Sequence, residues 1–220
     1  MKTLLSGILL SAALLFAGAA AAQSVNSKPR TVPAVRYYKG AVGKLPLKSV
    51  HLDFSVVKTA GLGKLDSVFT QELKSLGVQI SPSGTRIGLS TALPDSLKNI
   101  PSAYQVVVGK DVELRADSYE GFLYATRTLL QMLAQDKTNL SVPKGTVTDY
   151  PSLQRRMAML DVARVYFPVE VLKQYIRTMG WLKMNELHLH LNDNSWNSYG
   201  AYYRVPSEKY PGVTSPQHYS

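Results

Sequence analysis

The spacing of apolar residues predicts alternating strands and helices over the middle of the chain. Apolar residues recur every three or four positions from Leu65 to Leu76, which is typical of an amphipathic helix, and Gly77 supplies its stop. The residues from Gly109 to Asp111 have the composition of a hairpin turn between two strand-like runs. The runs that we interpret as strands are 49–57, 86–89, 104–108 and 112–116.

A second helix is expected after the last of these strands. Asp117 and Glu120 have the spacing of a capping box, in which each side chain accepts a backbone N–H that the helix leaves unpaired. An apolar face continues through Leu129, Leu130 and Leu133. Together with the strands, this helix predicts a small α+β domain that ends near Leu140.

Two segments that flank this domain have irregular composition. Residues 24–34 are polar and contain Pro29 and Pro33, which suits a leader strand or a linker more than a packed element. Residues 141–150 have the composition of a connector. We therefore place the small domain at 23–148 and begin a second unit at residue 149.

The second unit has the pattern of a strand, a helix and a strand. Residues 157–163 form an apolar run that Asp161 alone interrupts, as expected of a strand buried on both faces. Pro168 then opens a helix, and 186–192 alternate strictly between apolar and polar residues. One side of the helix carries Val169, Leu172, Ile176 and Met179, and the polar side of the second strand carries His188, His190 and Asn192. The short turn at 183–185 makes this a βαβ unit with a parallel pair of strands.

Composition and charge exclude several classes of protein. The chain has 220 residues, of which 45% are hydrophobic, and no cysteine, so thiol nucleophiles, zinc–thiolate sites and disulfide scaffolds are excluded. Its 25 basic against 15 acidic residues give a net charge of +10. The basic residues are scattered, and the densest places are Lys28 with Arg30 and the pair Arg155 and Arg156. We therefore expect a solvated basic surface and no nucleic-acid partner.

The first 22 residues have the three zones of a secretory signal peptide. Lys2 precedes an uncharged apolar run, and small residues from Ala17 to Ala22 precede Gln23, the first residue expected after cleavage. The alternative is a retained anchor, since 4–22 is close to the length that spans a bilayer. Polar and small residues dilute the run, and no basic residue follows until Lys28. We therefore expect a periplasmic or secreted protein with no stable membrane anchor.

Candidate chemistry gathers at the ends of the two parallel strands, where α/β folds place their active sites. A guanidinium and a carboxylate on neighbouring strand ends, Arg164 and Asp193, can hold the vicinal hydroxyls of a sugar. Two alternatives remain open: a metal site formed by His188, His190 and Asp193, and a buried Asp161 that is satisfied by backbone N–H groups or by Arg164. Aromatic residues that could stack on sugar rings, or pack as loops, are Trp181, Trp196, Tyr199, Tyr202 and Tyr203.

Several motifs of this unit resemble the opening of the catalytic barrel of family 20 glycoside hydrolases, the β-N-acetylhexosaminidases. The resemblance runs from about Tyr150 to Trp196, and 120–133 also resemble the last helix of the small domain that precedes that barrel. The motifs are Tyr-Pro at 150–151, Arg-Met-Ala-Met-Leu-Asp-Val-Ala-Arg at 156–164, Phe-Pro-Val at 167–169, Lys-Met-Asn at 183–185 and His-Leu-His-Leu-Asn-Asp at 188–193.

The resemblance implies a fold and a set of sugar-binding residues. The fold would be an α+β N-terminal domain followed by an incomplete (β/α)8 TIM barrel, represented at 149–220 by its first βαβ unit alone. Arg164 and Asp193 would bind hydroxyls of a terminal N-acetylhexosamine in a glycan, and Asp161 and His190 would support them inside the barrel. Neither a metal ion nor an organic cofactor is implied, and the oligomeric state stays open.

The resemblance also implies the mechanism and the limits of this chain. The substrate's own acetamido oxygen attacks the anomeric carbon, while an Asp orients the acetamide and the adjacent Glu protonates the leaving oxygen, which is a retaining mechanism. No counterpart of that Asp-Glu pair occurs before Ser220, and residues 149–220 are far fewer than the roughly 250 of a complete barrel. We therefore expect a fragment that holds no catalytic residue and is inactive alone.

Two other functions stay open at this stage. The family usually has Trp between the two histidines and a second acid after the first, where this chain has Leu189 and Asn194. That departure resembles a lacto-N-biosidase-type branch, which releases a disaccharide by the same mechanism. The alternative from another class is a non-catalytic carbohydrate-binding protein.

Overall fold

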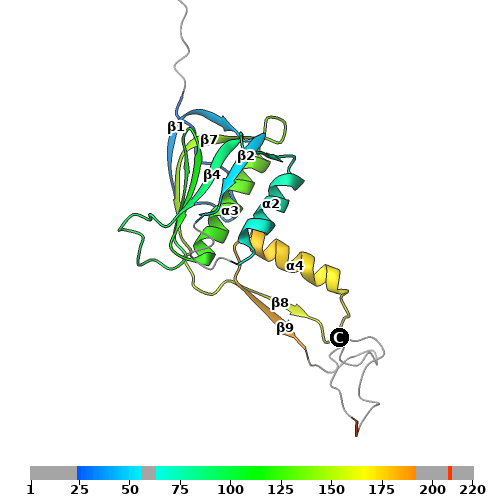
Figure 1. Ribbon diagram of the computed structural model, residues 1–220. Coiled ribbons are helices and arrows are strands. Elements are labelled where there is room, and N and C mark those ends of the chain that lie inside the picture. Colours follow the sequence, from blue (N-terminus) through cyan, green and yellow to red (C-terminus); the bar gives the residue numbers. More distant parts are fainter. Residues whose placement is uncertain (1–23, 56–62, 192–207, 210–220) are drawn as a thin grey trace, which may run out of the picture.

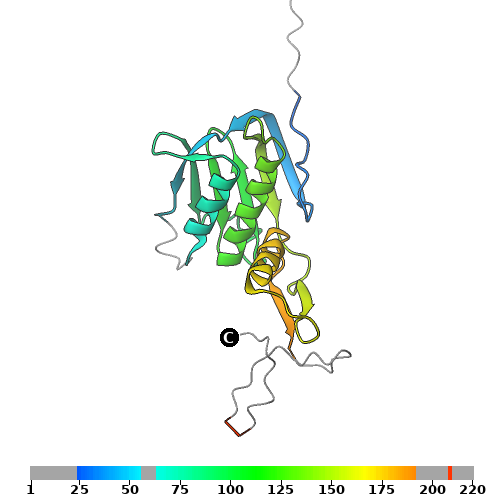
Figure 2. The same cartoon turned by 90° about the vertical axis from the view of Figure 1, so that its right-hand side faces the viewer.

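The computed structural model describes residues 24–55, 63–191 and 208–209 (Figure 1). The predicted signal peptide at 1–22 and the candidate residue Asp193 lie outside the described residues. A seven-stranded mixed sheet has two helices packed on one face, and a separate βαβ unit extends from one end of this layer pair (Figures 1 and 2). Among the described residues, no helix is both long and apolar enough to cross a membrane.

The large sheet combines an antiparallel half with a parallel half. Its order is β1-β7-β5-β6-β4-β2-β3. The pairs β1·β7, β7·β5 and β5·β6 are antiparallel, whereas β6·β4, β4·β2 and β2·β3 are parallel. The strands are β1 (Tyr37–Pro46), β2 (Ser49–Asp53), β3 (Gln79–Ile80), β4 (Thr85–Ser90), β5 (Tyr104–Val108), β6 (Val112–Ala116) and β7 (Ser141–Asp149).

The core lies between this sheet and the helices α2 (Leu65–Ser75) and α3 (Tyr119–Ala134). Helix α2 buries Leu65, Phe69 and Leu73, which are spaced at four residues as the sequence predicts. Gly77 adopts φ 91 directly after α2, so the predicted stop is confirmed in a conformation that favours glycine. Strands β5 and β6 and the turn between them are also confirmed, with alternate side chains buried under α3.

The segment predicted as a connector is instead a strand inside the sheet. Strand β7 lies between β1 and β5, so the interpretation of 141–150 is wrong. Pro143 has no N–H to donate, but the pairing with β5 runs only from Gly145 to Asp149 and leaves Pro143 beyond it. Gly145 pairs with Gly40 of β1 and has a φ angle of 146°. A Cβ atom on Gly145 would lie 2.6 Å from the Lys39 carbonyl oxygen, so the strand requires glycine there.

The predicted capping box at the start of α3 is also wrong. The N-cap is Ser118, whose backbone is extended and whose hydroxyl accepts a hydrogen bond from the Gly121 N–H. Position Gly121 therefore takes the place that a capping box gives to Glu or Gln. Glu120 instead accepts hydrogen bonds from the side chains of Ser102 and Tyr124.

Residues 24–34 were expected to be a leader strand or a linker more than a packed element, but Val25 bridges to Val42 of β1, and Arg30 and Val32 bond to α3. The Gln131 side chain accepts from the Val32 N–H at 2.7 Å and donates to the Val32 carbonyl at 2.9 Å. The Gln135 side chain makes the same pair of bonds with Arg30. Strands β1 and β3 were not predicted at all, and β2 is shorter than the predicted 49–57, of which 56–57 lie outside the described residues.

The βαβ unit consists of β8 (Met157–Asp161), α4 (Val169–Trp181) and β9 (Glu186–His190). Strands β8 and β9 pair in parallel, as predicted, with Asp161 opposite His190. The expected burial of the first strand on both faces is wrong for the described structure, because Met157 and Met159 are 49% and 57% exposed. Of the predicted apolar face of α4, Met179 alone is buried.

Candidate functional site

The carboxyl end of β8 brings Asp161 and Arg164 together. One oxygen of Asp161 accepts hydrogen bonds of 3.0 Å from the backbone N–H groups of Ala163 and Arg164. The other accepts from Arg164 Nη1 at 2.5 Å. Desolvation raises the pKa of Asp161, but the hydrogen bonds from Arg164 and Ala163 outweigh it and hold the pKa below its ordinary value. Asp161 is therefore an ionised carboxylate that fixes the direction of the Arg164 side chain.

The Arg164 guanidinium stands at an accessible edge. Its side chain is 46% exposed, and a guanidinium carries five N–H donors in a planar fork that matches paired oxygens. The predicted partner Asp193 lies outside the described residues, so the pairing of Arg164 with Asp193 stays a prediction. The described contacts pair Asp161 with backbone N–H groups and Arg164, as its alternative expected, but the side chain is 26% exposed and not buried.

His190 ends β9 beside this edge. Its carbonyl oxygen accepts a hydrogen bond of 3.1 Å from the Val162 N–H, which keeps the ends of β8 and β9 together. His188 lies two residues earlier on the same side of the strand and is exposed. No group of three or more His, Asp or Glu side chains that could hold a metal ion occurs within the described ranges. The metal alternative also requires Asp193, which lies outside them.

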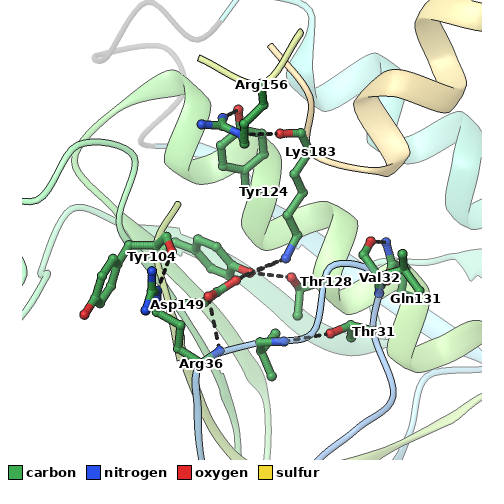
Figure 3. Close-up of polar contacts among 12 residues, drawn as sticks. Thr31, Val32, Arg36, Tyr104, Tyr124, Thr128, Gln131, Asp149, Arg156 and Lys183 are labelled. Atoms are coloured by element: carbon green, nitrogen blue, oxygen red, sulfur yellow. Dashed lines mark hydrogen bonds and ion pairs between the residues drawn. The ribbon is translucent and has the colours of Figure 1, made fainter. Parts of the chain in front are cut away.

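A second polar cluster lies at the opposite end of the βαβ unit, where it joins the large sheet (Figure 3). A cavity of about 380 Å³ opens there, and its lining includes Arg36, Tyr104, Tyr124, Asp149, Arg156 and Lys183. The Lys183 ammonium donates to the Tyr104 hydroxyl at 2.7 Å and lies 3.2 Å from an Asp149 carboxylate oxygen. Burial raises the pKa of Tyr104 well above its ordinary value, and the Asp149 charge adds to that rise.

The polar groups of this cluster are bonded to one another. Each buried side-chain nitrogen and oxygen among the described residues has a hydrogen-bond partner. Arg36 donates to the Tyr150 carbonyl at 2.9 Å and lies 4.2 Å from the centre of the Tyr150 ring. The cluster therefore joins two parts of the chain and is distinct from the Asp161–Arg164 edge. Sequence reasoning missed it, because a lysine in a polar turn has the appearance of a surface residue.

Models of two domains of one enzyme family match nearly all of the described chain. The domain 2 model of glycosyl hydrolase family 20 matches residues 28–150. The catalytic-domain model of the same family matches 154–219. The chain belongs to glycosyl hydrolase family 20. The predicted resemblance is thereby confirmed, and both Asp161 and Arg164 lie within the catalytic-domain match.

Curated relatives of this family 20 chain are named β-hexosaminidases. The Vibrio furnissii protein is 40% identical over 85 residues, which cover 39% of this chain and 14% of that protein. The Porphyromonas gingivalis protein is 34% identical over 153 residues, which cover 64% of this chain and 18% of that protein. The Akkermansia muciniphila protein is 32% identical over 143 residues, which cover 61% of this chain and 28% of that protein. The chain therefore spans less than a third of each of these three relatives.

Solved family 20 structures share the fold. A family 20 β-N-acetylglucosaminidase is 29% identical, with a TM-score of 0.60 over 75% of this chain and 31% of that one. The β-N-acetylhexosaminidase of Streptomyces coelicolor A3(2) has a TM-score of 0.63 over 77% of this chain and 36% of that one. At 23% identity, the second likeness is evidence for the fold alone.

Proposed function

We propose that this family 20 chain supplies the N-terminal domain and the first βαβ unit of the catalytic barrel of an exported β-N-acetylhexosaminidase. The observation that carries the proposal is the Asp161–Arg164 pair at the carboxyl edge of parallel strands. Active sites of (β/α)8 barrels are built at that edge. The pair lies within the match to the catalytic-domain model, and the curated relatives are named β-hexosaminidases.

The barrel part of the proposal is supported by the surfaces that the βαβ unit leaves uncovered. In the described residues, β8 and β9 pair only with each other. Met159 of β8 is 57% exposed and Ile176 of α4 is 53% exposed. A closed barrel pairs both edges of each strand and buries such apolar side chains between strands and helices.

In this proposal the chain binds the sugar and does not transfer protons to it. Arg164 donates hydrogen bonds to hydroxyls of the terminal N-acetylhexosamine, Asp193 accepts from one of them, and Asp161 keeps the guanidinium in position. His190 supports the same edge from β9. The acetamido oxygen of the substrate is the nucleophile, and an Asp-Glu pair on a later strand orients the acetamide and protonates the leaving oxygen.

The proposal predicts a strict requirement for the acetamido group. The longest in-frame product that contains residues 23–220 will hydrolyse p-nitrophenyl N-acetyl-β-glucosaminide. It will hydrolyse p-nitrophenyl β-glucoside at least about a thousandfold more slowly, because the second substrate lacks the intramolecular nucleophile. Initial rates of p-nitrophenol release measure the ratio.

Residues 23–220 alone are the control in this assay. They are expected to release no p-nitrophenol above a buffer blank, because the chain has no counterpart of the Asp-Glu pair. Comparable rates on the two substrates, or turnover by residues 23–220 alone, would contradict the proposed function.

A further inference from the structure

Helix α4 ends in a backbone conformation that normally belongs to glycine. Lys183 adopts φ 58, its N–H bonds to the Gly180 carbonyl at 3.0 Å, and the Met184 N–H bonds to the Met179 carbonyl at 2.9 Å. These two bonds are the Schellman motif, in which the residue after the cap is left-handed. Helix α2 ends with the same two bonds, and there the left-handed residue is Gly77. Lys183 thus carries a Cβ atom where the backbone disfavours one.

The side chain of Lys183 accounts for this choice of residue. It runs from the βαβ unit into the N-terminal domain, where its ammonium bonds to Tyr104 of β5 and Asp149 of β7 (Figure 3). The Tyr104 hydroxyl in turn donates its one proton to the same Asp149 oxygen at 2.6 Å. Between Tyr104 and Thr128 of α3, the donor is therefore the Thr128 hydroxyl. The side chains of Lys183 and Asp149 are 6% and 10% exposed. A glycine would relax the backbone but would leave this buried carboxylate without its cation.

A second cation fastens the neighbouring strand to the same domain. Arg156 directly precedes β8 and donates to the Lys183 carbonyl at 2.7 Å. It also donates to the Glu120 carboxylate at 3.1 Å and to the Tyr124 hydroxyl, both on α3. The starts of both parallel strands are therefore held by side chains that cross to the N-terminal domain and by a bond that links them to each other.

Apolar contact between α4 and the N-terminal domain is confined to the end of the helix, where Trp181 packs against the core of that domain. Met179 is also buried, whereas Val169 and Val171 of the same helix are 49% and 44% exposed. The α4 backbone is held at its last residue, where the Gln131 side chain donates to the Trp181 carbonyl at 2.9 Å. The two parts are therefore joined by Trp181 at the end of α4 and by polar bonds at the amino-terminal ends of β8 and β9.

We infer that Lys183 is a positioning residue, which orders the βαβ unit on the N-terminal domain and so sets the direction of the strand ends that carry Asp161 and Arg164. The N-terminal domain then acts as the platform of the barrel's first two strands. The bonds are made by the described residues alone. The inference therefore does not depend on the substrate or on turnover, and it can fail or succeed separately from the proposed function.

The test is hydrogen exchange of residues 23–220 carrying Lys183→Gly. A purely local role at the helix end predicts unchanged or increased protection, because glycine suits the left-handed position. The positioning role predicts that amides of 157–161 and 186–190 lose protection by about tenfold or more, since a buried hydrogen-bonded charge is removed. Amides of 104–108 and 112–116 keep theirs. Lys173→Ala, which removes an exposed cation from α4, is the matched control and leaves both regions unchanged.

A double variant keeps the test decisive if the lone Asp149 carboxylate disturbs the large sheet. Lys183→Gly combined with Asp149→Asn removes both charges and keeps an acceptor for the Arg36 N–H, which bonds to Asp149 at 3.2 Å. The inference requires that protection in this variant is lost in β8 and β9 and retained in β5 and β6. Retention in all four strands, or an equal loss in all four, overturns it.

Discussion

Replacing Arg164 by Lys will lower kcat/KM for a terminal N-acetyl-β-hexosaminide roughly thirtyfold to a thousandfold. This corresponds to a loss of about 2–4 kcal/mol of transition-state stabilisation. The variant is made in the longest in-frame product that contains this chain. Lysine keeps the charge but loses the planar fork that can bond two hydroxyls at once. In the wild type, Arg164 Nη1 bonds to Asp161, which leaves the other N–H donors of the planar guanidinium to face the sugar. Steady-state kinetics on one chromogenic substrate measure the loss.

Arg155→Lys is the matched control. Arg155 precedes β8 at the opposite end from Arg164, its side chain is 76% exposed, and it pairs with Glu186 at 2.8 Å. An exposed ion pair contributes little, so this variant should behave like the wild type. If Arg164→Lys also retains wild-type kcat/KM and lowers only the thermal midpoint, then Arg164 is an internal partner of Asp161 and does not bind the sugar.

Asp193→Asn should lower kcat/KM somewhat less than Arg164→Lys, because the amide still offers one acceptor.

Glu72→Ala will lower the unfolding free energy of residues 23–220 by about 3–5 kcal/mol, a large share of the stability of an ordinary domain. Arg127 of α3 is 5% exposed, and its guanidinium bonds to both carboxylate oxygens of Glu72 on α2. Removing the acid leaves a charge that is buried in the core without its counter-ion. Urea titration followed by circular dichroism measures the change.

The reverse truncation should cost much less. Arg127→Met removes the buried charge itself and leaves Glu72, which is 31% exposed and can be hydrated, so we expect a loss of about 1 kcal/mol. Glu113→Ala is the surface control, since Glu113 and its partner Arg115 are each about a third exposed. If Glu72→Ala is no more harmful than Glu113→Ala, the ion pair does not hold α2 on α3.

The predicted elements that agree with the structure are those whose pattern and boundaries have local causes. Strands β5 and β6 were predicted residue for residue, because their alternation is regular and a tight turn joins them. Strand β7 was missed because Pro143 and Gly145 have the composition of a loop. Its place in the sheet depends on partners far along the chain, since Gly145 faces Gly40 and Pro143 lies outside the pairing with β5. A local pattern does not carry that information.

The contacts around the candidate site also differ in whether the sequence predicts them. Asp161 and Arg164 are three residues apart at a strand end, so their contact could be expected from the sequence alone. The joint of Lys183 with Asp149 and Tyr104 connects residues 34 and 79 positions apart, and no periodicity predicts it. Its one local signal is a lysine where a helix stop favours glycine, and that signal is visible only once the backbone angle is known.

If the proposed function is correct, the carboxyl ends of β8 and β9 hold the terminal sugar. A crystal structure of the longest in-frame product that contains this chain, with N-acetylglucosamine bound, tests it most directly. We expect Arg164 to donate hydrogen bonds of ordinary length, about 2.7–3.2 Å, to sugar hydroxyls while Asp161 still accepts from the Arg164 backbone N–H. Asp193 accepts a bond from a hydroxyl of the same sugar. A sugar that lies away from both side chains, with Arg164 bonded to protein groups alone, would contradict the proposed binding site.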